Sequence, residues 1–122
     1  MAKFQISNFK FRFIHITEMV KNITDTDFKS EISDNENVAI KFYADWCGSC
    51  RLISPKFKNL SEQENYSGIS FIEVNAETNP EARKWASVKN LPFFAVVKNG
   101  EIVEASSAGK EEKIIEMLGK LA

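Results

Sequence analysis

Two stretches of the chain, residues 38–44 and 69–74, constrain its fold more than any other feature. Each is largely apolar and carries a single charged residue, Lys41 in the first and Glu73 in the second. Such strands are buried on both faces, which is typical of parallel sheets covered by helices. The segment between them has a helical period, with apolar residues at i, i+4 and i+7: Ile53, Phe57 and Leu60. The pattern predicts a β-α-β unit, and hence an α/β fold.

The residues before this unit predict two further elements. Phenylalanines alternate with basic residues over 8–16, which predicts a half-buried strand, with the phenylalanines more typical of strand packing than of a partner-binding surface. Thr24 or Asp25 is placed to cap a short helix that carries Phe28 and Ile32 on one face.

The residues after the unit predict a helix, a hairpin and a final helix. Pro80 suits the first turn of a helix, and Asn99-Gly100 predicts a hairpin between strands over 93–98 and 101–105. A last helix starts near Lys110 and presents one apolar face: Ile114, Ile115, Leu118 and Leu121. We therefore expect a central mixed β-sheet flanked by helices on both faces, to which the N-terminal segment can add an extra strand.

Composition excludes several classes of function. A chain of 122 residues fits one domain. Its net charge of -1 argues against nucleic-acid binding, which needs a basic excess. No run approaches the roughly 20 apolar residues that span a bilayer, so we expect no membrane segment. The N-terminal residues lack the apolar stretch of a secretory signal, and we therefore expect a cytoplasmic protein.

The two cysteines, Cys47 and Cys50, are the chemically informative residues. As a structural crosslink, so small a loop contributes only about 2 kcal/mol. Two cysteines and the single histidine, His15, are too few for a metal site within one chain, because four ligands are normal. A metal shared between two chains remains open. The remaining interpretation is redox chemistry.

The chain resembles the thioredoxin family over residues 19–122, most closely between residues 38 and 100. The matching segments are Ala44-Asp45-Trp46-Cys47-Gly48-Ser49-Cys50, Pro55, Val74-Asn75-Ala76-Glu77-Thr78-Asn79-Pro80, Leu91-Pro92 and Lys98-Asn99-Gly100. The spacings between them also match. The resemblance implies the thioredoxin fold for residues 19–122, and leaves residues 1–18 as an N-terminal extension, a strand or an arm.

The resemblance implies that Cys47 attacks a substrate disulfide and that Cys50 resolves the mixed disulfide. Cys47 follows a predicted strand and begins a helix, whose unpaired N–H groups stabilise a negative sulfur. Cys50 follows at i+3, where helix geometry places the two Cα atoms about 5 Å apart, within disulfide reach. Gly48 is expected to let the chain turn tightly into this helix.

Three positions at and beneath the cysteines depart from the family pattern. Ser49 replaces a proline between the cysteines, which predicts a more oxidising pair. Lys41 stands where the family carries a buried aspartate beneath the second cysteine, and Glu73 stands where it carries a lysine. We expect the two to form an ion pair of reversed polarity near Cys50, although both could instead reach solvent separately. In that pair Glu73, and not Lys41, is able to accept a proton.

The resemblance also implies a substrate-binding surface. Leu91-Pro92 matches a loop with a cis peptide bond that faces the cysteines. Trp46 is expected to form an apolar rim beside Cys47, with a buried core position as the alternative. Phe93, in place of the usual threonine, makes that rim more apolar. Either Ala108 or Gly109 supplies a glycine-like position near this loop.

From the sequence we expect a monomeric thioredoxin-like protein-disulfide reductase. The resemblance implies protein disulfides as substrates, no bound cofactor, no metal, and electrons from a thioredoxin reductase. Two alternatives remain: a disulfide oxidase or isomerase, suggested by Ser49 and Lys41, and a binding module of the same fold without redox turnover.

Overall fold

The computed structural model describes residues 19–107 and 109–121. Within these residues, five strands form one mixed sheet in the order β2-β4-β3-β5-β6. β2, β4 and β3 run parallel, whereas β5 is antiparallel to β3 and β6 to β5. The strands are β2 (Val20–Asn22), β3 (Asn37–Tyr43), β4 (Ser70–Asn75), β5 (Phe93–Lys98) and β6 (Glu101–Ser106).

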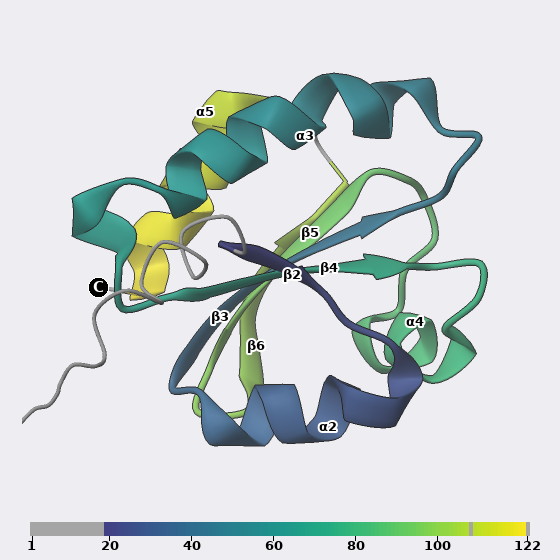
Figure 1. Ribbon diagram of the computed structural model, residues 1–122, viewed down its shortest axis with the longest axis horizontal. Helices are drawn as coiled ribbons and strands as arrows, with labels where there is room; N and C mark the ends of the chain where they lie inside the picture. The colour runs from purple at the N-terminus through teal and green to yellow at the C-terminus, as the bar shows by residue number, and fades with distance from the viewer. Residues whose placement is uncertain (1–18, 108, 122) are drawn as a thin grey trace, which may run out of the picture.

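Helices cover both faces of this sheet. In Figure 1, α3 and α5 lie above the sheet and α2 and α4 lie below it. The helical segments are α2 (Asp25–Asp34), α3 (Gly48–Ser61), α4 (Pro80–Ala86), α5 (Glu111–Leu118) and the 3-10 turns η1 (Glu64–Tyr66) and η2 (Gly119–Leu121). The predicted α/β class, the thioredoxin fold, is confirmed. None of the helices in the described part of the chain is long and apolar enough to cross a membrane.

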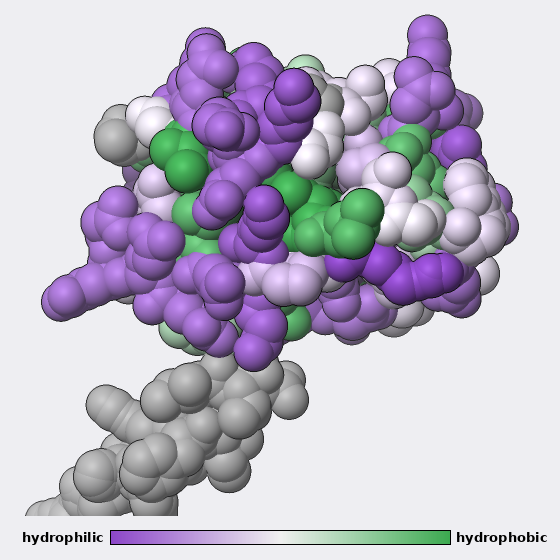
Figure 2. Space-filling view, turned by 90° about the horizontal axis from the view of Figure 1, so that it is seen from above, coloured by the Kyte–Doolittle hydropathy of each residue, from purple (hydrophilic) through white to green (hydrophobic). Residues whose placement is uncertain are grey.

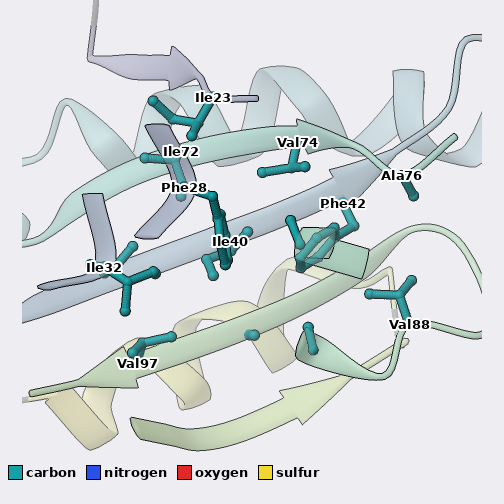
Figure 3. Packing of buried hydrophobic residues seen from close by; sticks show 14 residues of the cluster. Ile23, Phe28, Ile32, Ile40, Phe42, Ile72, Val74, Ala76, Val88 and Val97 are labelled. Atoms are coloured by element: carbon teal, nitrogen blue, oxygen red, sulfur yellow. The ribbon is translucent and has the colours of Figure 1, made fainter. Parts of the chain in front are cut away.

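The alternation of side chains along β3 divides the core into two halves. Val38, Ile40 and Phe42 belong to the hydrophobic cluster between the sheet and the helices α2 and α4, which Figure 3 shows in detail. Ala39 packs on the opposite face with residues of α3 and α5. Because successive side chains in a strand point to opposite faces, Lys41 also lies on the α3 side. The fold itself therefore places this one charge of β3 beneath the helix that begins after Cys47.

The predicted elements agree with the structure in order, and differ from it in two details. The short strand β2 was not predicted, because three residues are too few to show a period. Ile115, which was predicted to lie on the buried face of α5, is 42% exposed. Met117 is buried on that face instead. The predicted hairpin forms, with positive φ at Asn99 (52°) and Gly100 (85°). The predicted strand over 8–16 lies outside the described residues.

Helices α2 and α4 begin side by side and cap each other. Thr24 precedes α2, but its side chain makes no capping hydrogen bond. The Asp25 backbone N–H instead donates to Asn79 Oδ1 (2.8 Å), and the Asp25 carboxylate accepts from the N–H groups of Glu81 (3.1 Å) and Ala82 (2.9 Å) in α4. The prediction that the Thr24 side chain caps α2 is therefore wrong. Asp25 caps a different helix, α4. Local sequence patterns cannot show this contact, because Asp25 and Glu81 are 56 residues apart.

Asp25→Ala is expected to lower the free energy of unfolding by about 1–2 kcal/mol, because two N–H groups of α4 lose their acceptor. Urea unfolding followed by circular dichroism measures this change. Asp27→Ala is the matched control, since it removes an exposed carboxylate from the first turn of the same helix. Equal losses in the two variants would mean that capping of α4 contributes nothing.

Candidate active site

Cys47 and Cys50 lie where the chain passes from β3 into α3. Cys47 is the N-cap residue of α3, and its sulfur accepts a hydrogen bond from the Cys50 backbone N–H (3.1 Å). The two cysteines form a disulfide, with their Cα atoms 5.3 Å apart, as the predicted helix geometry requires. Both side chains are buried in this oxidised state, with Cys47 5% and Cys50 2% exposed. An N–H group and the positive end of a helix thus already face the Cys47 sulfur.

Lys41 and Glu73 form the ion pair that the sequence predicted. They occupy directly adjacent positions of the parallel strands β3 and β4. Lys41 Nζ lies 3.1 Å from Glu73 Oε1, with the Lys41 side chain 4% exposed and the Glu73 side chain 29% exposed. The alternative, in which both side chains reach solvent separately, is wrong. The lysine is the buried partner, and the carboxylate is the one that water can reach.

Ser54 connects this pair to Cys50. The Lys41 ammonium donates to Ser54 Oγ, and the Ser54 hydroxyl donates to the Cys50 backbone carbonyl (2.9 Å). Ser54 was not among the residues predicted from the sequence. Its spacing of four residues from Cys50, one turn along the same face of a helix, was the available signal.

A second side-chain contact fixes the outer oxygen of Glu73. The Asn22 amide donates to the Tyr43 hydroxyl (2.7 Å) and, at 3.5 Å, to Glu73 Oε2. Asn22 belongs to β2, the strand that was not predicted, so nothing in the sequence pointed to it. The carboxylate is consequently held between Lys41 on one side and Asn22 on the other.

A cavity of about 280 Å³ opens beside Cys50. Its lining includes Cys50, Ser54, Lys41 and Glu73. The space is large enough for several water molecules, each of which needs roughly 30 Å³ of liquid volume. The cavity therefore gives water room to bridge the Glu73 carboxylate and Cys50.

The loop before β5 faces the cysteines. The peptide bond between Leu91 and Pro92 is cis, as expected. Leu91 packs against the buried cluster that contains Cys47 and Cys50. A Cβ added to Gly109 would lie 3.1 Å from Pro92 Cγ. A side chain at Gly109 would therefore crowd Pro92, whereas Ala108, the other position that the sequence offered, lies outside the described residues.

The remaining predicted residues differ in their exposure. Trp46 is 65% exposed, so its alternative position in the core is wrong. Phe93 is half-buried and meets Phe42 edge to face (ring centroids 6.0 Å apart), which ties it to the core as well as to the surface. Ser49 is exposed. Gly48 has no positive φ, and an added Cβ would meet open space, so the expected tight turn does not require a glycine there.

Hydrophobic surface near the cysteines extends beyond the predicted residues. Leu52, in the first half of α3, is 78% exposed and was missed, because its position in the sequence looks like an ordinary helix position. Figure 2, which views the α3 and α5 side, shows a largely hydrophilic surface through which hydrophobic patches emerge. Among the described residues there is no group of three or more His, Cys, Asp or Glu side chains that could hold a metal ion.

Comparison with known proteins agrees with this geometry. The sequence model of the thioredoxin family matches residues 19–120. The chain belongs to the thioredoxin family. Thioredoxin-1 of Schizosaccharomyces pombe is 39% identical over 87 residues, which cover 70% of this chain and 82% of that protein. The solved thioredoxin of Plasmodium falciparum has a TM-score of 0.77 at 31% identity, and the match covers 84% of this chain and 99% of that one.

A further solved structure shares the fold at lower identity. It is a thioredoxin f2 in complex with ferredoxin:thioredoxin reductase, with a TM-score of 0.76, 23% identity, and coverage of 83% of this chain and 93% of that one. The family, together with the cysteine pair that forms a disulfide, shows a thiol–disulfide oxidoreductase. This thioredoxin-family protein reduces protein disulfides by dithiol–disulfide exchange.

Proposed function

We propose that Cys47 is the nucleophile of this exchange and Cys50 the resolving residue. The Cys47 thiolate attacks a substrate disulfide, a Cys47–substrate disulfide forms, and one substrate thiolate leaves. Cys50 then loses its proton and attacks the Cys47 sulfur, which releases the second substrate thiolate and leaves the Cys47–Cys50 disulfide. The observation that supports these roles best is the N-cap position of Cys47, where the helix end favours its thiolate.

Glu73 is the base that takes the proton from Cys50 in this proposal. A protonated Lys41 has no lone pair to accept a proton, and Glu73 shares the cavity beside Cys50. The proton passes through water in that cavity. Lys41 acts through its position: its charge beneath the start of α3 favours the Cys50 thiolate, and its contact with Ser54 fixes it there.

Glu73→Gln is expected to slow resolution of the mixed disulfide by about 10²-fold and to leave its formation nearly unchanged. Rapid-quench kinetics with a disulfide-bonded peptide separate the two steps. Glu62→Gln is the control, because the Glu62 side chain pairs only with Lys58, at the surface, among the described residues. Equal slowing of both steps, or of neither, would remove Glu73 from the proton path.

The substrate-facing surface in this proposal consists of Trp46, Gly48, Ser49, Leu91, Pro92 and Phe93. Support comes from the exposure of Trp46 and from the contact of Leu91 with the cysteine cluster. The cis loop and the exposed tryptophan flank the disulfide and leave the approach over Gly48 open.

Electrons come from a thioredoxin reductase, and the dithiol itself carries them without a bound cofactor or metal. A thioredoxin f2 of the same fold binds ferredoxin:thioredoxin reductase, which supports a reductase partner here. Insulin reduction, followed by turbidity, tests the function. Activity with thioredoxin reductase and NADPH is expected. Activity only with dithiothreitol would contradict the reductase partner, and none under either condition would contradict disulfide reduction itself.

Ser49 supports a second candidate within the same chemistry, a disulfide oxidase or isomerase. It occupies the position between the cysteines where a proline would stiffen the helix start. A redox titration against glutathione decides between the two. A potential near about −270 mV is that of a reducing thioredoxin, and a clearly more positive value favours the oxidase.

A cytoplasmic location and a monomeric state are part of the proposal. A dithiol reductase works where the surrounding thiols are kept reduced, which favours the cytoplasm. Cell fractionation and light scattering are the corresponding measurements. A membrane-enclosed location or a stable dimer would contradict them.

A further inference from the structure

A basic groove lies at the carboxyl end of β4, next to the candidate active site. It has a volume of about 510 Å³ and opens between the start of α4 and the loop that follows α4. Its charged lining residues are Arg83, Lys84, Lys89 and Glu77. Ala76 and Val88 form part of its apolar lining, and Figure 3 shows these two residues at the same end of the core cluster.

The charge of this groove departs from that of the whole chain. Three cationic side chains against one carboxylate give a local charge of +2, whereas the chain carries -1. Lys84 and Lys89 are exposed, and neither has a carboxylate within 4 Å in the described part of the chain. The nearby Asp25 carboxylate is already engaged by backbone N–H groups of α4.

Arg83 is held in place by the loop of the groove. Its Nε donates to the Val88 backbone carbonyl (3.3 Å). This contact orients the guanidinium and leaves its terminal N–H groups as further donors, since arginine carries five. Planar guanidinium groups match carboxylates in a bidentate manner. The groove therefore combines one oriented guanidinium with two unpaired ammonium groups.

The groove is connected to the cysteines through short contacts. The Ala76 N–H donates to the Tyr43 carbonyl (2.8 Å), at the end of the strand that leads to Cys47. Leu91 packs against both the cluster that contains Val88 and the cluster that contains the cysteines. A polypeptide whose disulfide reaches Cys47 can consequently place its neighbouring residues over the groove.

We propose that this basic groove binds an acidic segment of the substrate protein next to the disulfide that Cys47 attacks. This inference rests on the proposed function and adds a class of substrate to it. Carboxylates of the segment pair with Arg83, Lys84 and Lys89, and Glu77 at the rim disfavours basic segments. The contribution is electrostatic at an exposed site, so it is screened by salt.

The test uses two peptides that each contain one disulfide and differ only in three flanking residues, Asp-Glu-Asp in one and Asn-Gln-Asn in the other. At low ionic strength the wild-type protein is expected to reduce the acidic peptide roughly fivefold faster, the upper range for an exposed ion pair. The preference should fall below about twofold in 1 M salt, where the Debye length is about 3 Å.

Lys89→Glu is expected to abolish the preference and leave the rate with the neutral peptide unchanged. Lys56→Glu is the matched control, because Lys56 is an exposed lysine on α3 without a carboxylate partner among the described residues, and it should keep the preference. Equal rates for both peptides in the wild type, or equal losses in both variants, would overturn the inference and leave disulfide exchange intact. Failure to reduce either peptide would count against the proposed function itself.

Discussion

Cys47→Ser is expected to lower disulfide reduction by at least about 10³-fold. A serine hydroxyl is not ionised near neutral pH and cannot form the covalent intermediate, so the first step of the exchange is lost entirely. The position of the residue at the N-cap of α3 is unchanged by this substitution, because serine is a favoured N-cap residue. The variant should therefore fold normally. Insulin reduction with dithiothreitol as the electron donor measures the loss.

Cys50→Ser separates the two cysteines by role. This variant keeps the nucleophile, so it should form a mixed disulfide with substrate proteins and fail to release it. Mass spectrometry of the trapped species identifies the attached cysteine. Ser49→Ala is the control and should turn over within a few fold of the wild type, because it leaves both sulfurs in place. A mixed disulfide on Cys50 in Cys47→Ser, combined with no mixed disulfide on Cys47 in Cys50→Ser, would reverse the assignment.

Lys41→Asp is expected to lower the free energy of unfolding by about 3–5 kcal/mol. It removes the partner of Glu73 and places a second carboxylate in the adjacent strand position, on the buried side beneath α3. It also removes the donor to Ser54. Urea unfolding curves of the reduced protein measure the change.

The double variant Lys41→Asp/Glu73→Lys should recover most of this stability, because it restores opposite charges at the same two positions with their order exchanged. The matched control is the reversed surface pair Lys58→Glu/Glu62→Lys, whose single and double variants should each change stability by less than about 1 kcal/mol. If Lys41→Asp cost no more than the surface variants, the buried pair would contribute nothing. A double variant as unstable as the single one would show that the two side chains do not act as a pair.

The sequence predicted those parts of the site that follow from a strand or helix period. Lys41 and Glu73 interrupt apolar strands, and parallel pairing of those strands is enough to bring them together. Cys47 and Cys50 follow from the spacing of a helix start. Each of these predictions depends on residues that are neighbours within an element or along a buried sheet.

The missed contacts arise between elements that are distant in the sequence. Asn22 reaches Glu73 from a strand of three residues, which shows no period. Asp25 caps α4, which begins 55 residues later, although local capping rules assign it to its own helix. Ser54 looked like an ordinary polar residue on a helix. Only the packing of α3 over β3 places its hydroxyl between Lys41 and Cys50.

The ionisation of Cys47 in the reduced protein is the central point of this account. The absorbance of thiolates at 240 nm, followed against pH in wild-type protein and in Cys50→Ser, measures it most directly. The N–H group and helix end that face the sulfur should lower the pKa of Cys47 clearly below the ordinary cysteine value of about 8.5. A Cys47 thiol that stays protonated up to that value or above it would contradict the proposed nucleophile.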